Sequence, residues 1–201
     1  MKQAKKDKKE LIIEAAARVF AEKGFNNSTI SEVARSAGVG KGTVYEYFNS
    51  KTELFYQVFE WYMKFTAESA AHSMKTLKGS AAQRLLRLSD SIMNYWSEHM
   101  ELFTLTMEFW AASASSEIKQ SFKEIFKNGY REFRGLIENF LREGIASKEF
   151  REDLDVPAVA ASLVGTWDAL LLQGWFDKEF DSVAANSGYL QVLIKGLQKE
   201  E

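Results

Sequence analysis

The sequence predicts an all-α protein of about nine helices, and three observations support this fold class. Proline occurs once, at Pro157, and no segment shows the sustained alternation of apolar and polar residues that is typical of strands. Apolar residues recur instead every three to four positions, as in amphipathic helices. The 201 residues are 46% hydrophobic, enough to bury a sizeable core, and the absence of cysteine excludes disulfides and thiolate metal sites.

The N-terminal quarter of the chain is predicted to form three short helices. The first ends near Gly24, a residue typical of helix C-termini. The second follows Thr29, which has Glu32 three residues later in a capping-box pattern. The third follows a glycine-rich segment and runs to about Phe48. Apolar residues on one face of the first helix predict its buried side: Ile12, Ala15, Ala16, Val19 and Phe20.

Longer helices are expected in the remainder of the chain. Ser50 and Glu53 repeat the capping-box pattern and begin a long fourth helix, and Asp155 with Pro157 gives a second clear start signal. Apolar stripes from Leu85 to Trp96 and from Phe103 to Trp110 indicate two further helices, and others are expected over about 116–147, about 155–174 and about 181–198. We therefore expect two domains, a helix-turn-helix domain over 1–52 and a larger helical domain over 53–201.

The glycine-rich segment "SAGVGKGTVYEYF", residues 36–48, has two possible interpretations. A phosphate-binding Walker loop needs a different glycine spacing and a preceding strand, and neither is present. A short helix, a tight turn containing glycine and a second short helix are typical of a helix-turn-helix. The helix-turn-helix interpretation accounts for more of the residues.

The second helix of such a motif enters the DNA major groove. Its helical spacing places Val44 and Phe48 against the core and leaves Gly42 and Thr43 on the opposite side. The charge distribution agrees: residues 1–52 hold ten Lys/Arg and six Asp/Glu, a net charge of +4, whereas the remainder carries −6. A solvated lysine tail explains the charge equally well, and packing of a short helix is an alternative role for its tyrosines.

Residues 29–55, "TISEVARSAGVGKGTVYEYFNSKTELF", closely resemble the DNA-binding signature of the TetR family of bacterial regulators, and the resemblance covers roughly residues 8–60. It implies an all-helical homodimer that binds a palindromic operator and releases it when a small molecule occupies the C-terminal domain. Repression, rather than activation, is also implied by the resemblance. The positions that match the groove-reading helix are Lys41, Gly42, Thr43, Tyr45 and Tyr47, and those that match phosphate contacts are Thr29 and Lys51.

The C-terminal domain is rich in aromatic residues and methionine. We expect an effector pocket between the fourth helix and the helices over about 85–140, without basic residues in its lining, so that a hydrophobic or flat aromatic ligand is favoured over a phosphorylated or strongly anionic one. A cation is the alternative if Glu108 turns inward, and a plain helical core is an alternative to any pocket. The expected lining residues are Tyr62, Phe65, Met93, Trp96, Phe103, Met107, Trp110, Phe126, Tyr130 and Trp167.

The last two helices, over about 155–174 and 181–198, carry apolar residues on nearly all sides. A helix of this kind must be buried on two faces, so we expect a twofold four-helix interface in a homodimer. Asp168 is expected to pair at that interface or to lie at the helix surface.

Two other function classes are open to the sequence: a DNA-binding protein without an effector, and an enzyme. The chain has only His72 and His99, and no pattern pairs a nucleophile with a base, so we expect no catalytic residue, metal or cofactor. No apolar run approaches the roughly 18–20 residues that span a bilayer, and no signal peptide is recognisable, so a cytoplasmic protein is expected.

Overall fold

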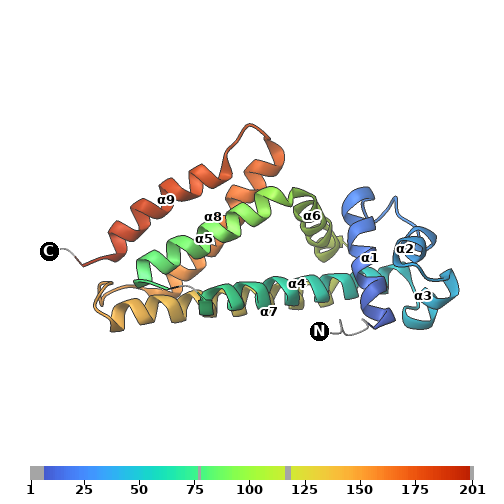
Figure 1. Ribbon diagram of the computed structural model, residues 1–201, viewed down its shortest axis with the longest axis horizontal. Coiled ribbons are helices and arrows are strands. Elements are labelled where there is room, and N and C mark those ends of the chain that lie inside the picture. Colours follow the sequence, from blue (N-terminus) through green and yellow to red (C-terminus); the bar gives the residue numbers. More distant parts are fainter. Residues whose placement is uncertain (1–6, 77, 116–118, 200–201) are drawn as a thin grey trace. The chain divides into compact units, whose positions relative to one another are not determined.

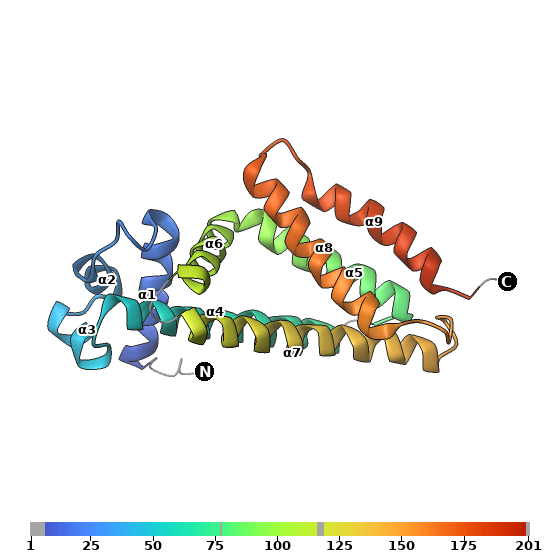
Figure 2. The ribbon, with the colours of Figure 1, turned by 180° about the vertical axis from the view of Figure 1, so that it is seen from behind.

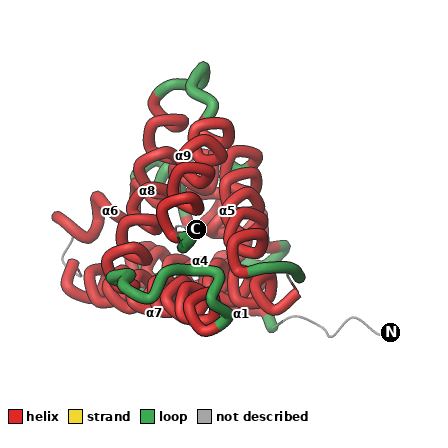
Figure 3. Tube along the Cα trace, turned by 90° about the vertical axis from the view of Figure 1, so that its left-hand side faces the viewer, coloured by secondary structure: helices red, strands yellow, loops and turns green. Residues whose placement is uncertain are grey.

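The computed structural model describes the backbone of residues 7–76, 78–115 and 119–199, and within these it leaves out the side chains of 67, 69–76, 101, 102 and 115. The described residues form nine helices and no strand (Figure 3), which confirms the predicted fold class. The helices are α1 (Lys8–Lys23), α2 (Ile30–Ala37), α3 (Lys41–Tyr47), α4 (Lys51–Thr76), α5 (Ala81–Glu98), α6 (Met100–Ser115), α7 (Lys119–Ala146), α8 (Val156–Phe176) and α9 (Ser182–Leu197).

The chain divides into two compact units. The first consists of Met1–Phe65 and Thr104–Ile125, and the second of Thr66–Phe103 and Phe126–Glu201. Helices α4, α6 and α7 contribute residues to both units. The division into compact units therefore differs from the domain boundary that we expect between residues 52 and 53. That boundary separates two functions and stays a prediction.

In the first unit, α1, α2 and α3 pack together beside the beginning of α4 (Figure 1). The predicted inner face of α1 is buried throughout, as are Val44 and Phe48 of α3. Beyond them an aromatic cluster joins α1, α4, α6 and α7, and its ring centroids lie 4.3–6.3 Å apart. The members of this cluster are Phe20, Phe25, Phe55, Phe59, Phe109 and Phe122.

The helix starts follow the sequence signals closely. Thr29 and Glu32 form the complete capping box, and Asp155 caps α8 by accepting a hydrogen bond from the backbone N–H of Ala158. The Ser50 hydroxyl accepts the N–H of Glu53 at 3.0 Å, but the Glu53 carboxylate accepts from the N–H of Asn49 rather than completing the box. This second box is therefore shifted by one residue.

In the second unit, α8 packs beside α5 and α9 (Figure 2). A buried polar cluster joins these three helices: the Ser89 hydroxyl lies 2.7 Å from the indole nitrogen of Trp167 and 3.0 Å from the amide nitrogen of Asn186. All three side chains are buried. The Glu149 carboxylate accepts the backbone N–H groups of Ala81 and Ala82, and so caps the beginning of α5 from a distant loop.

Helix α8 differs from one sequence expectation. Within the described part of the chain, it is the one helix that is long and apolar enough to cross a membrane. A single helix of this kind is weak evidence for a membrane span, and 33% of its most apolar stretch is buried. The expectation rested on uninterrupted apolar runs, and Asp168 interrupts this one while leaving the helix apolar on average. An apolar helix that its own chain covers only in part needs another cover.

Candidate functional site

The turn between α2 and α3 explains the first of the clustered glycines. Gly38 has φ +69° and ψ +30°, a left-handed conformation that side chains disfavour, and it ends α2. The N–H of Val39 bonds back to the carbonyl of Ala34 at 3.0 Å, which closes the turn. Gly40 is extended and precedes the first residue of α3. The segment is therefore a tight turn between two short helices, as the helix-turn-helix interpretation predicts.

Helix α3 presents its predicted DNA-reading face to the outside. Tyr45 and Tyr47 are 48% and 37% exposed, and Lys41 and Gly42 are exposed beside them. The ammonium of Lys41 lies 6.0 Å from the ring centroid of Tyr45. Thr43 is half-buried on the same helix.

Gly42 is the most informative residue of this face. A Cβ atom added there would meet no heavy atom within 4 Å, and its backbone has no positive φ. The fold therefore does not need glycine at this position, the second residue of α3. A missing side chain on an exposed helix lets another molecule approach the backbone closely, and a DNA groove is such a partner.

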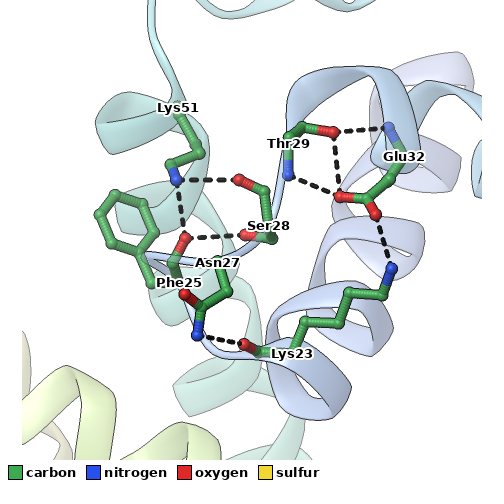
Figure 4. A network of polar contacts seen from close by, with 7 residues as sticks. All are labelled: Lys23, Phe25, Asn27, Ser28, Thr29, Glu32 and Lys51. Atoms are coloured by element: carbon green, nitrogen blue, oxygen red, sulfur yellow. Dashed lines mark hydrogen bonds and ion pairs between the residues drawn. The ribbon is translucent and has the colours of Figure 1, made fainter.

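The two residues expected on phosphates have partners within the chain (Figure 4). The Thr29 hydroxyl takes part in the capping box with Glu32. The Lys51 ammonium donates to the carbonyls of Phe25 at 2.7 Å, Ser28 at 3.0 Å and Asn26 at 3.4 Å. Their phosphate contacts stay predictions, and Lys51 has a structural role that sequence reasoning missed because its partners lie 23–26 residues away.

The cap of α2 is strongly electrostatic. The Lys23 ammonium lies 2.5 Å from one Glu32 carboxylate oxygen, and the Thr29 hydroxyl and N–H bond the other. The hydrogen bond from Lys23, followed by those from Thr29, lowers the pKa of Glu32 from 4.5 to about 2. The capped end of α2 therefore keeps its carboxylate ionised over the whole neutral range.

In the first unit, four of the expected effector residues lie on α4 and α6. Tyr62 is buried, and its hydroxyl lies 3.0 Å from the hydroxyl of Thr106. Met107 and Trp110 are half-buried, whereas Phe65 is 48% exposed. Glu108 does not turn inward toward a cation as one alternative required: its carboxylate accepts the backbone N–H of Phe25 at 2.9 Å.

In the second unit, Met93, Phe103 and Trp167 are buried, and Trp96, Phe126 and Tyr130 are half-buried. The Tyr130 hydroxyl donates to the Asp168 carboxylate at 2.6 Å. Burial is the main cause that raises the pKa of both groups.

Asp168 is half-buried and pairs with α7 of its own chain, so it does not lie free at the helix surface. Its expected position at a subunit interface stays a prediction. The role of all ten residues in binding an effector stays a prediction.

A helix-turn-helix with an exposed second helix defines a DNA-binding protein of the helix-turn-helix class. The sequence model of the family described as "Bacterial regulatory proteins, tetR family" matches residues 12–58. The fatty acid metabolism regulator protein of Bacillus subtilis is 30% identical over 203 residues, with 100% of both chains covered. The chain therefore belongs to the TetR family.

Two further comparisons agree. The crystal structure of the transcriptional regulator FadR from Bacillus subtilis in complex with stearoyl-CoA has a TM-score of 0.74 and 29% identity, and covers 94% of this chain and 99% of that one. The HTH-type transcriptional repressor KstR2 of Mycobacterium tuberculosis is 26% identical, with 94% of this chain and 92% of the repressor covered. The protein is a DNA-binding transcriptional regulator, and these relatives are all named as regulators.

Proposed function

We propose that this regulator is a homodimeric repressor that binds a palindromic operator through α3 and releases it when a long-chain acyl thioester binds the C-terminal domain. The observation that carries the DNA-binding part is Gly42, a glycine that the fold does not need on the most exposed face of α3. Beside it, Lys41 and Thr43 offer groups that hydrogen-bond base edges, and the exposed tyrosines suit the phosphate backbone.

The choice of ligand draws on the full-length similarity to the Bacillus subtilis fatty acid metabolism regulator and to the crystal structure of FadR from the same organism, which was solved with stearoyl-CoA. The candidate effector residues are mostly apolar or aromatic, which suits an acyl chain. The phosphorylated head of such a thioester is more anionic than the ligand that the sequence favours, so we place the head outside the apolar lining and the acyl chain within it.

The uncovered faces of the last two helices support the proposed homodimer. Phe176 is 74% exposed at the end of α8 and Val192 is 72% exposed on α9. Gly165 and Gly188, exposed on the same two helices, have no heavy atom within 4 Å of an added Cβ. Exposed apolar side chains and open glycines on the same helices allow close packing against a second copy of the chain. A homodimer that acts on DNA in the cytoplasm fits these features.

The test begins by selecting binding sites for the wild-type protein from a pool of random DNA duplexes. We expect a palindrome to be enriched, and its affinity is then measured with stearoyl-CoA, with stearate and with coenzyme A at equal concentrations. Stearoyl-CoA should weaken binding about 5–150-fold, the usual range for coupled sites. Stearate and coenzyme A, each of which lacks half of the ligand, should have little effect.

The other function classes give different results in the same experiment. Affinity that no compound changes would support a DNA-binding protein without an effector. Hydrolysis of the thioester during the incubation would support an enzyme. Enrichment of no site would count against operator binding altogether.

A further inference from the structure

Phe25, in the turn between α1 and α2, is held through both of its backbone polar groups. Its N–H donates to the Glu108 carboxylate at 2.9 Å, and its carbonyl accepts from the Lys51 ammonium at 2.7 Å. Both bonds involve a charged group, and such bonds are stronger than those between neutral groups. Lys51 lies at the beginning of α4 and Glu108 lies on α6, so side chains from two helices hydrogen-bond one residue of the turn.

The surroundings of Phe25 are shaped for the Glu108 contact. Gly24 has φ +76°, and a Cβ atom added there would lie 2.8 Å from a Glu108 carboxylate oxygen. Any larger residue at this position would press on the carboxylate. The Phe25 ring packs against Phe55 with centroids 4.4 Å apart, and the Lys51 ammonium lies 4.4 Å from the same ring.

The same turn leads directly to the DNA-binding helices. The Ser28 hydroxyl donates to the Phe25 carbonyl at 2.8 Å, and the Ser28 carbonyl accepts from Lys51 (Figure 4). The next residue, Thr29, caps α2, and α2 packs on α3. The hydrogen bonds of Phe25 are therefore a link between α2, α3 and α6, in addition to the aromatic cluster that joins α1, α4 and α6.

We propose that Glu108 is a positioning residue for operator binding, through its hydrogen bond to the N–H of Phe25. Helix α6 also carries Met107 and Trp110, two of the candidate effector residues, so a ligand that shifts this helix would move the Glu108 carboxylate with it. This proposal rests on the proposed function, because positioning matters only if α3 reads a specific site.

The test compares Glu108→Ala, Glu108→Gln and the control Glu22→Ala, an exposed glutamate on α1. Each alanine variant removes one negative charge from the first unit, and charge alone predicts slightly tighter binding to any DNA. Positioning predicts the opposite sign for Glu108→Ala: about tenfold weaker binding to the selected palindrome, with random DNA unchanged or tighter. Glu108→Gln keeps an acceptor oxygen and should recover most of the affinity. Backbone amide exchange, followed by NMR, should be faster at Phe25 in Glu108→Ala and unchanged at the buried Phe20.

The outcomes separate this proposal from the proposed function. Failure of the wild type to enrich any site counts against the proposed function. An unchanged exchange rate at Phe25 overturns the Glu108 contact, whether or not DNA is bound. Equal changes in affinity for the palindrome and random DNA, as in Glu22→Ala, overturn positioning. If Glu108→Ala shows no unfolding transition, Glu108→Gln becomes the test. Its neutral oxygen is a weaker acceptor, so exchange at Phe25 should be faster and affinity for the palindrome somewhat lower with random DNA unaffected, and no change in either would overturn the proposal.

Discussion

Gly38 and Gly42 lie four residues apart, yet they are glycine for different physical reasons. Gly38 has φ +69°, so a side chain there strains the backbone even though the surrounding space is open. Gly42 has a helical backbone and open space, so a methyl group there strains nothing within the chain. The first residue serves the fold, and the second we assign to the approach of DNA.

Substitution by alanine separates these two roles. Gly42→Ala should leave the free energy of unfolding unchanged or raise it by at most about 0.5–1 kcal/mol, the value for a helix interior, while weakening binding to the selected palindrome. Gly38→Ala should lower the free energy of unfolding by about 1–2 kcal/mol. Urea unfolding and DNA titration of both variants give the two quantities. Unchanged affinity in Gly42→Ala would argue against a close approach of DNA at this residue.

The pH dependence of stability should report the cap of α2. Because the folded-state pKa of Glu32 lies at about 2, below its ordinary value of 4.5, the folded protein binds fewer protons there than the unfolded chain. The stabilisation is complete above about pH 4.5 and is lost as the pH falls toward 2.

We therefore expect Glu32→Gln to be less stable than the wild type at pH 7, with the difference shrinking below pH 4.5, in urea unfolding at a series of pH values. Lys23→Gln should reduce the same pH-dependent difference, because Lys23 provides the largest cause of the shift. A difference that stays constant down to pH 2.5 would contradict this assignment.

Residue roles could be predicted from the sequence where the partners are close along the chain. The Thr29 cap spans three residues, and the buried face of α3 follows from helical spacing. The partners of Lys51, Glu108 and Asp168 lie 26, 83 and 38 residues away, and no local pattern identifies them. Long-range polar contacts depend on the packing of whole helices, which the sequence does not state.

At the scale of the elements, prediction succeeded because the helix starts carry their own signals. The last two helices were expected over 155–174 and 181–198 and lie at Val156–Phe176 and Ser182–Leu197. Which helices pack together was less accessible. The cluster of Ser89, Trp167 and Asn186 joins α5, α8 and α9. No local sequence pattern indicates that these three residues are in contact.

This cluster gives a matched stability test. Ser89→Ala removes one oxygen but leaves the buried indole nitrogen of Trp167 and the amide of Asn186 without that partner, so it should lower the free energy of unfolding by about 1–3 kcal/mol. Ser91→Ala, an identical change at an exposed position of α5, should stay within about 0.5 kcal/mol of the wild type. Equal small effects in urea unfolding would mean that other partners satisfy these groups.

At the scale of the whole molecule, the uncovered apolar faces of α8 and α9 require an explanation. By composition, α8 also meets the criteria for a membrane span, but it is partly buried within its own unit by α5 and α9. We propose that a second copy of the chain covers the remaining face without a lipid phase. The proposed palindromic operator would require two recognition helices in one particle, which such a dimer provides.

The dimer is tested by placing a charge on that face. Val192→Glu puts a carboxylate where an apolar side chain is 72% exposed in the single chain. Burial of an unpaired charge at the interface should raise the dimer dissociation constant at least about tenfold, or roughly 1.4 kcal/mol. Asn139→Asp, at an exposed position of α7, adds one negative charge to the same unit and is the control.

Sedimentation at micromolar concentration should show a wild-type dimer that Val192→Glu shifts toward monomer, with the helical content unchanged. Affinity for the palindrome should fall with the dimer, because one half-site alone binds weakly. A monomeric wild type, or a Val192→Glu dimer as stable as that of Asn139→Asp, would exclude this face as the interface.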